Sequence, residues 1–167
     1  FDALRVCEKG LKLAPGNGLT NQFKLSALIM IGDTAKINRY LVEIRALMEE
    51  YKIAYAEQEY WIGVAYRCGR DTINAIVHFR KAIASDPGNN WFKENLAELL
   101  IKSGTNMKEG LEITEKALMS DPEAFGFMFL KGIALHESGD NRTALKYMSK
   151  ALESYPMVNQ DVMSWIN

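Results

Sequence analysis

Small residues and prolines recur along this chain of 167 residues at a nearly constant interval. Four sets keep one register, with 34 or 35 residues between neighbouring members: Gly69, Gly104 and Gly139; Ala82, Ala117 and Ala151; Pro87, Pro122 and Pro156; and Gly63, Ala97 and Gly132. A fixed period of this length is typical of proteins built by stacking one structural unit. The chain is therefore expected to fold as a repeat protein.

Each set has a physical role in a pair of helices. A glycine in mid-helix at Gly63 costs up to about 1 kcal/mol against alanine, which is offset if a second helix crosses closely there, with Ala82 on its facing side. Gly69 is expected to end the first helix in a left-handed conformation, and Asp71 to cap the second. Asp-Pro at 86–87 would stop that helix and start the next. One period thus encodes two antiparallel helices.

In this pattern the chain resembles the tetratricopeptide-repeat (TPR) family, whose unit is a helix–turn–helix of about 34 residues. Three copies carry the match: Gly63, Tyr66, Ala75, Phe79, Ala82 and Pro87; Leu96, Ala97, Leu100, Ala117 and Pro122; and Gly132, Leu135, Gly139, Ala144, Ala151 and Pro156. The resemblance is clear over about residues 56–156 and divergent over 1–55. It implies an all-α fold, a right-handed α-solenoid of antiparallel helix pairs in a TPR-like superhelix.

We expect a single TPR-like domain over residues 1–167. Its parts would be a partial repeat, a divergent repeat, three regular repeats, and a segment that begins a capping helix or a further repeat: 1–15, 18–52, 56–89, 90–124, 125–158 and 159–167. The chain opens in mid-helix without a methionine, so we expect it to be a piece of a longer protein. The divergent repeat has Ile37, Leu41 and Ile44 where alanines usually stand, so its helices should pack more widely.

The sequence contains no constellation that predicts catalysis. His78 and His136 are the two histidines, and both are expected to be ordinary helix residues. His136 and Glu137 are adjacent and diverge on a helix, so they are not expected to share a metal ion, and no phosphate-binding glycine motif is present. Carboxylates such as Glu57 and Glu59 are expected on solvated helix faces. We therefore predict a protein that is not an enzyme, without catalytic, cofactor-binding or metal-binding residues.

Charge and hydropathy limit the kinds of partner. The formal net charge is −1, so no broad positive field for nucleic acid is expected. No apolar run is long enough to cross a bilayer, which predicts no direct membrane insertion. Exposed apolar surfaces at the two ends would allow copies of this piece to associate end to end. The sequence leaves the compartment open and slightly favours the cytoplasm.

Stacked helix pairs curl, and the first helix of each pair lines the concave side. Residues of those helices that packing does not use are predicted to bind a peptide or protein segment: Phe23, Tyr60, Trp61, Arg67, Asn95, Glu98, Lys102 and His136. Aromatic anchors beside polar groups suit such a partner. The competing interpretation, in which these aromatics belong to the core between repeats, stays open. The predicted function is a non-catalytic scaffold for protein–protein interaction.

An alternative is that the chain is the TPR segment of a larger enzyme or of a polysaccharide-export or secretion protein, whose groove contacts sugar or assembly partners. A third role is disfavoured. Some family members hold the carboxylate of chaperone peptides with Lys, Arg and Asn on successive first helices. Asn95 matches the asparagine, but Tyr60, Gly126 and Leu130 stand where the basic residues should be.

Overall fold

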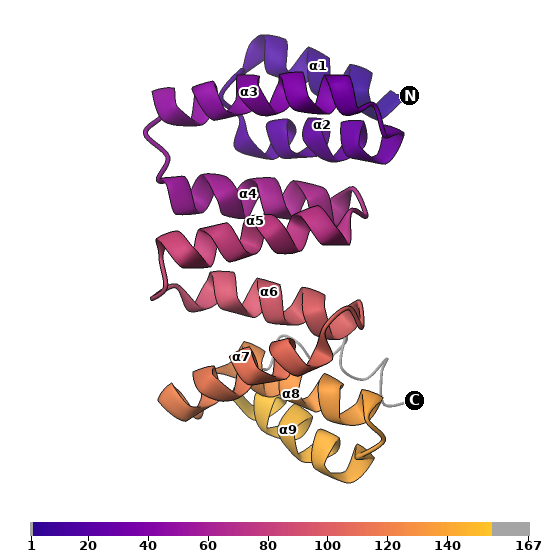
Figure 1. The fold of residues 1–167 in the computed structure, drawn as a ribbon, viewed down its shortest axis with the longest axis vertical. Helices are drawn as coiled ribbons and strands as arrows, with labels where there is room; N and C mark the ends of the chain where they lie inside the picture. Colours follow the sequence, from indigo (N-terminus) through magenta and orange to yellow (C-terminus); the bar gives the residue numbers. More distant parts are fainter. Residues whose placement is uncertain (1, 155–167) are drawn as a thin grey trace. The chain divides into compact units, whose positions relative to one another are not determined.

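The computed structural model describes residues 2–154, and every regular element in that range is an α-helix (Figure 1). The helices in chain order are α1 (Asp2–Leu13), α2 (Gly18–Ile31), α3 (Thr34–Glu50), α4 (Tyr55–Cys68), α5 (Thr72–Ser85), α6 (Asn90–Lys102), α7 (Met107–Ser120), α8 (Phe125–Glu137) and α9 (Asn141–Ser154). Short turns join them, so consecutive helices run antiparallel. Pro156 and the expected capping segment 159–167 lie outside the described residues.

The helices divide into two compact units, residues 1–92 (unit 1) and residues 93–167 (unit 2). Unit 1 is centred on Leu25, Ile62 and Phe79, whose side chains are fully buried. Unit 2 has a core that gathers around α6, α7, α8 and α9, with members such as Phe127 and Met148. The expectation of one domain with the repeat boundaries given above stays a prediction.

Polar side chains fix where α2, α3, α5, α7 and α9 begin. In each case a side-chain oxygen accepts a hydrogen bond from the backbone N–H three residues further on, which satisfies a donor that the helix leaves unpaired. The pairs are Asn17 with Thr20, Asp33 with Lys36, Asp71 with Asn74, Asn106 with Glu109, and Asp140 with Thr143. The predicted cap at Asp71 is confirmed. In contrast, α4 and α8 follow Ala54 and Ala124 and have no side-chain cap.

Gly69 ends α4 as predicted, but the prediction that it adopts a left-handed conformation is wrong. Gly104 and Gly139 do adopt the left-handed conformation, with φ of 67° and 89°, but Gly69 has φ of −76° and the left-handed residue there is Arg70. A Cβ atom on Gly69 would lie 2.6 Å from the side chain of Ile29 on α2. Close packing of α2 against the end of α4 therefore explains this glycine.

The Asp-Pro pairs stop a helix but do not start the next one. Asp86 adopts φ of −137° after α5, as expected for a residue that precedes proline. Because α6 begins at Asn90 and α8 at Phe125, Pro87 and Pro122 lie in the turns. This corrects the expectation that proline occupies the first turn of the following helix.

The close crossing predicted at the mid-helix glycines is present. A Cβ atom on Gly63 would lie 2.7 Å from the ring of Phe79 on α5, and one on Gly132 would lie 2.7 Å from the Met148 side chain on α9. Ala82 is fully buried on the same helix as Phe79. The hairpins α4–α5 and α8–α9 are thus as close at these crossings as the absence of a side chain allows.

Replacing Gly63 with alanine should therefore destabilise the protein although alanine favours helix. The added methyl group must displace the buried Phe79 ring, and overpacking of this kind costs about 1–3 kcal/mol. The matched control is Gly18→Ala, because a Cβ there meets nothing within 4 Å. Urea unfolding followed by circular dichroism measures both. Equal stability of the two variants would contradict the close-packing explanation.

Candidate functional site

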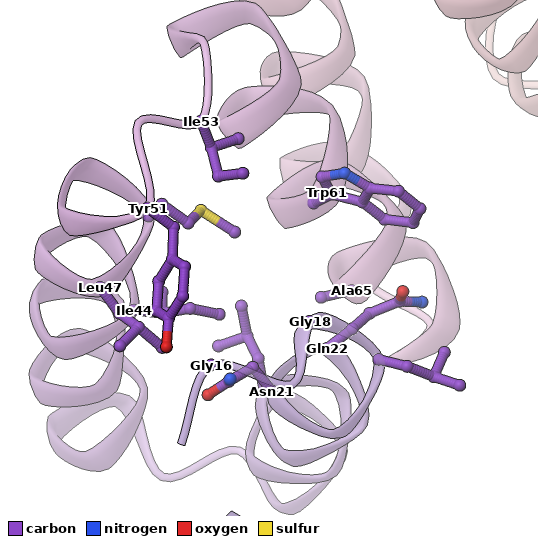
Figure 2. A pocket seen from close by; sticks show the side chains of 13 residues that line it. Gly16, Gly18, Asn21, Gln22, Ile44, Leu47, Tyr51, Ile53, Trp61 and Ala65 are labelled. Atoms are coloured by element: carbon purple, nitrogen blue, oxygen red, sulfur yellow. The ribbon is translucent and has the colours of Figure 1, made fainter. Parts of the chain in front are cut away.

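Unit 1 contains an apolar pocket with a volume of about 290 Å³ between α2, α3, α4 and the turn that precedes α2 (Figure 2). None of its lining residues carries a charge: they are Gly16, Gly18, Leu19, Asn21, Gln22, Leu25, Ile44, Leu47, Met48, Tyr51, Ile53, Trp61 and Ala65. This volume is at the lower end of the range of ligand pockets, about 300–1,000 Å³. The pocket is the candidate functional site.

The pocket lies where the divergent repeat departs from the small-residue pattern. Gly63, Ala97 and Gly132 each stand seven residues before a left-handed residue, and Leu25 holds that place before Gly32. Ala82, Ala117 and Ala151 each stand eleven residues after the capping residue, and Ile44 holds that place after Asp33. Both bulky residues line the pocket. The side chains that keep α2 and α3 from closing on each other thus form part of its wall.

Two aromatic side chains frame the pocket from opposite sides. Figure 2 shows Tyr51, which directly follows α3, and Trp61 on α4 on opposite sides of the cavity. Both remain substantially exposed, as does Leu19 on α2. The Tyr51 ring lies directly over Gly16, where a Cβ atom would come within 2.5 Å of it. A side chain at position 16 would therefore displace this wall.

The polar groups in the lining are already engaged within the protein. Asn21 donates through Nδ2 to the carbonyl oxygens of Pro15 and Asn17, at 2.8 and 2.9 Å, and accepts from the Tyr40 hydroxyl through Oδ1. Gln22 Nε2 lies 3.9 Å from Cys68 Sγ. Burial is the main reason that the pKa of Tyr40 is raised, so this hydroxyl stays protonated and keeps donating. A guest would find mainly apolar surface.

A buried ionic network lies behind the same helices. Glu59 on α4 is 0 % exposed. One of its oxygens is 2.6 Å from Arg45 Nη2 on α3, and the other is 2.7 Å from His78 Nδ1 on α5. The Tyr66 ring stacks on the imidazole at 5.2 Å. Because an ionised carboxylate only accepts hydrogen bonds, Nδ1 of His78 carries the proton. The network joins three helices.

Burial by itself raises the pKa of Glu59, but the hydrogen bonds from His78 and Arg45 outweigh it and lower the pKa from 4.5 to about 2. Glu59 is therefore ionised at neutral pH, and both of its oxygens are occupied. This corrects the expectation that Glu59 lies on a solvated face and that His78 is an ordinary helix residue. The network is a structural tie between three helices, and none of its members lines the pocket.

Four of the predicted binding residues lie in unit 1, and they divide by exposure. Phe23 on α2 and Trp61 on α4 are 52 % and 45 % exposed. Tyr60 is only 5 % exposed, because its ring stacks on Phe92 at 5.0 Å and its hydroxyl accepts a hydrogen bond from Trp91 Nε1. Arg67 is half-buried, with its guanidinium 5.9 Å from the centre of the Phe79 ring. Tyr60 thus belongs to the core of this unit.

The other four predicted residues lie in unit 2. Asn95 is buried. Glu98 and Lys102 form an ion pair of 2.8 Å along α6. His136 is exposed at the end of α8, and its Nδ1 is 2.7 Å from Asn141 Oδ1. Glu98, Lys102 and His136 therefore present charged or polar groups to solvent, and Asn95 does not.

Sequence reasoning missed the pocket and the buried network. A signal for the pocket existed in the bulky residues of the divergent repeat, whereas nothing in the local sequence distinguishes Glu59 from Glu57. Over residues 2–154, no group of three His, Cys, Asp or Glu side chains could hold a metal ion. Within the same range, no helix has both the length and the apolar character needed to span a bilayer.

No protein-family model matches the chain, and no curated protein matches it by sequence. Several solved structures are similar to the chain in fold. The crystal structure of MamA is 24 % identical, with a TM-score of 0.58 over 94 % of this chain and 89 % of that one. YrrB, described as a TPR protein with an unusual peptide-binding site, is 13 % identical, with a TM-score of 0.60 over 96 % and 81 % of the two chains. These matches concern the fold, and they confirm the predicted all-α solenoid of helix pairs.

Acid should destabilise the protein through Glu59. Its pKa of about 2 in the folded state is below its ordinary value of 4.5, so folding favours the ionised form. The stabilisation is complete above the pKa of the unfolded chain and is lost as the pH falls from about 5 toward 2. The shift corresponds to roughly 3 kcal/mol in the free energy of unfolding.

Urea unfolding at neutral pH and at acid pH checks this expectation. Glu59→Gln should cost about 3 kcal/mol at pH 7, because Arg45 loses its buried partner, and its stability should then vary less with pH. Glu57→Gln is the matched control on the exposed face of the same helix. An acid dependence as steep in Glu59→Gln as in the unchanged protein would contradict the assignment.

Proposed function

We propose that this chain, which has the tetratricopeptide-repeat fold, is a non-catalytic scaffold that binds a peptide or protein segment. The fold supports the proposal, because stacked helix pairs present extended binding surfaces. The neighbour YrrB, described as a TPR protein with an unusual peptide-binding site, also supports an interaction role. The balanced charge of the chain agrees with a protein partner better than with nucleic acid.

The observation that carries the proposal is the exposure of Phe23 and Trp61. These large apolar side chains stand on α2 and α4, which are neighbouring first helices within unit 1. Tryptophan is enriched among the residues that dominate binding energy at protein interfaces. A scaffold that keeps two aromatic side chains half in water gains free energy when a partner covers them.

The other residues of the predicted set have supporting roles in this proposal. Tyr60 contacts Trp61 edge-on, with 5.2 Å between the ring centres, and so limits the positions of the exposed indole. Rigid aromatic contacts lose little conformational entropy on binding. In unit 2, Glu98, Lys102 and His136 offer charged and polar groups suited to the rim of an interface.

Selection from a displayed library of random twelve-residue peptides, with the full chain as bait, tests the proposal. The selected peptides should bind Phe23→Ala and Trp61→Ala at least about tenfold more weakly than the unchanged chain, since hot-spot truncations cost 2 kcal/mol or more. Isothermal titration calorimetry gives the dissociation constants.

The matched control is Ile73→Ala, which removes a 73 % exposed apolar side chain from the second helix α5. It should bind the selected peptides like the unchanged chain. A library that yields no specific peptide would overturn the proposed function. If neither Phe23→Ala nor Trp61→Ala changed the affinity for the selected peptides, the role of these two side chains would be overturned.

A further inference from the structure

We propose that the pocket between α2, α3 and α4 is the anchor site for the partner, and that it accepts one large uncharged side chain from a segment that carries a basic residue beside it. This inference rests on the proposed function and names the chemistry of the segment. Trp61 is one of the two exposed aromatic side chains on which the proposed function rests, and it also lines the pocket. A segment that covers this indole therefore has the pocket within reach.

The lining selects an apolar guest. Among its side chains only Asn21, Gln22 and the Tyr51 hydroxyl are polar groups beyond the indole N–H of Trp61, and Asn21 already makes three hydrogen bonds within the protein. A charged guest would lose hydration without finding a partner, which is strongly unfavourable. An apolar guest of aromatic size would bury its surface in a cavity of about 290 Å³.

The pocket is preformed by side chains that cannot easily relax. Leu25 and Ile44 are buried, and they occupy the places that small residues hold in the other repeats. The Arg45–Glu59 ion pair links α3, which contributes Ile44 and Leu47 to the lining, to α4. Because α3 is held by this tie, the cavity need not be opened by the guest, and pre-organisation of this kind favours binding.

Charges on the segments that supply Tyr51, Ile53 and Trp61 to the lining favour a basic neighbour in the guest. The end of α3 and the start of α4 carry Glu49, Glu50 and Glu57 against one ammonium group, that of Lys52, and all four are exposed. Glu57 stands one helical turn before Trp61, so the two side chains share a face of α4. By contrast, the turn before α2 and the start of that helix, residues 14–23, have no charged residue. The segments that join α3 to α4 therefore carry more negative than positive charge.

Two capped dipeptides probe the site directly. Acetyl-Phe-Lys-amide and acetyl-Phe-Glu-amide share the apolar anchor and differ in charge, and each is titrated into the ¹⁵N-labelled full chain. The amide signals of Gly18 and Ala65 and the indole signal of Trp61 should shift in a saturable way. The lysine peptide should bind about two to five times more tightly, with a preference that shrinks in high salt and in Glu57→Gln. Equal affinity, or tighter binding of the glutamate peptide, would overturn the basic neighbour.

A glycine pair tests the pocket without removing a lining side chain. Gly16→Ala must displace the Tyr51 ring, so it should weaken binding of the lysine peptide at least about threefold. Gly88→Ala adds the same methyl group in a turn outside the pocket lining, where the nearest contact, Asp86 Oδ1 at 3.6 Å, is an ordinary one, and should leave binding unchanged. Ala65→Met, which extends a buried lining residue into the cavity, provides a second test if Gly16→Ala does not fold. Undiminished binding in a folded pocket variant would overturn the anchor site.

The outcomes separate this inference from the proposed function. Library peptides that depend on Phe23 but not on Gly16 would leave the scaffold proposal standing and overturn the pocket. A pocket occupied by the chain itself would also overturn it. Pocket signals that change in dilute Trp165→Ala without peptide would assign the site to the terminal segment of the same chain. Pocket signals that change on dilution of the unchanged chain would assign it to a second copy.

Discussion

The structure depends on how closely two helices of a hairpin can approach. At Gly63 and Gly132 the approach is limited only by the missing side chain, and the partner helix places Phe79 or Met148 against the bare backbone. The dispersion contacts between such closely packed atoms are individually weak, but their sum is large. Where the same positions hold bulky residues, as at Leu25, the helices cannot nest in the same way. One constraint therefore accounts both for the tight hairpins and for the cavity in the divergent repeat.

Helix α3 of the divergent repeat is linked to its neighbours by a different interaction. Arg45 reaches Glu59 in the interior of unit 1, and His78 completes the pairing of that carboxylate. A buried charge without these partners would be strongly destabilising. The ion pair joins α3 to α4 through residues that do not line the pocket. The tie and the pocket are in this sense complementary features of the divergent repeat.

Tyr60 and Trp61 show what helical spacing leaves undecided. Adjacent residues point about 100° apart on a helix, so both appear near the open face when only the period is known. The structure turns Tyr60 toward Phe79 and Phe92 and leaves Trp61 at the mouth of the pocket. The choice depends on where α6 begins and which aromatic residues it brings. Those neighbours are separated from Tyr60 by about thirty positions in the chain, beyond the range of any local pattern.

The order of the helices, the cap at Asp71 and the close crossing at Gly63 follow from the amino-acid sequence alone, because capping and helix packing within a hairpin act between residues near in the chain. Tertiary structure alone decided that Glu59 is buried while Glu57 is exposed, that Gly69 is needed for contact with Ile29, and that bulky side chains leave a pocket rather than a filled core. These outcomes depend on which surface a distant helix presents. Burial is a property of the assembled helices, whereas helix boundaries are already encoded by short stretches of chain.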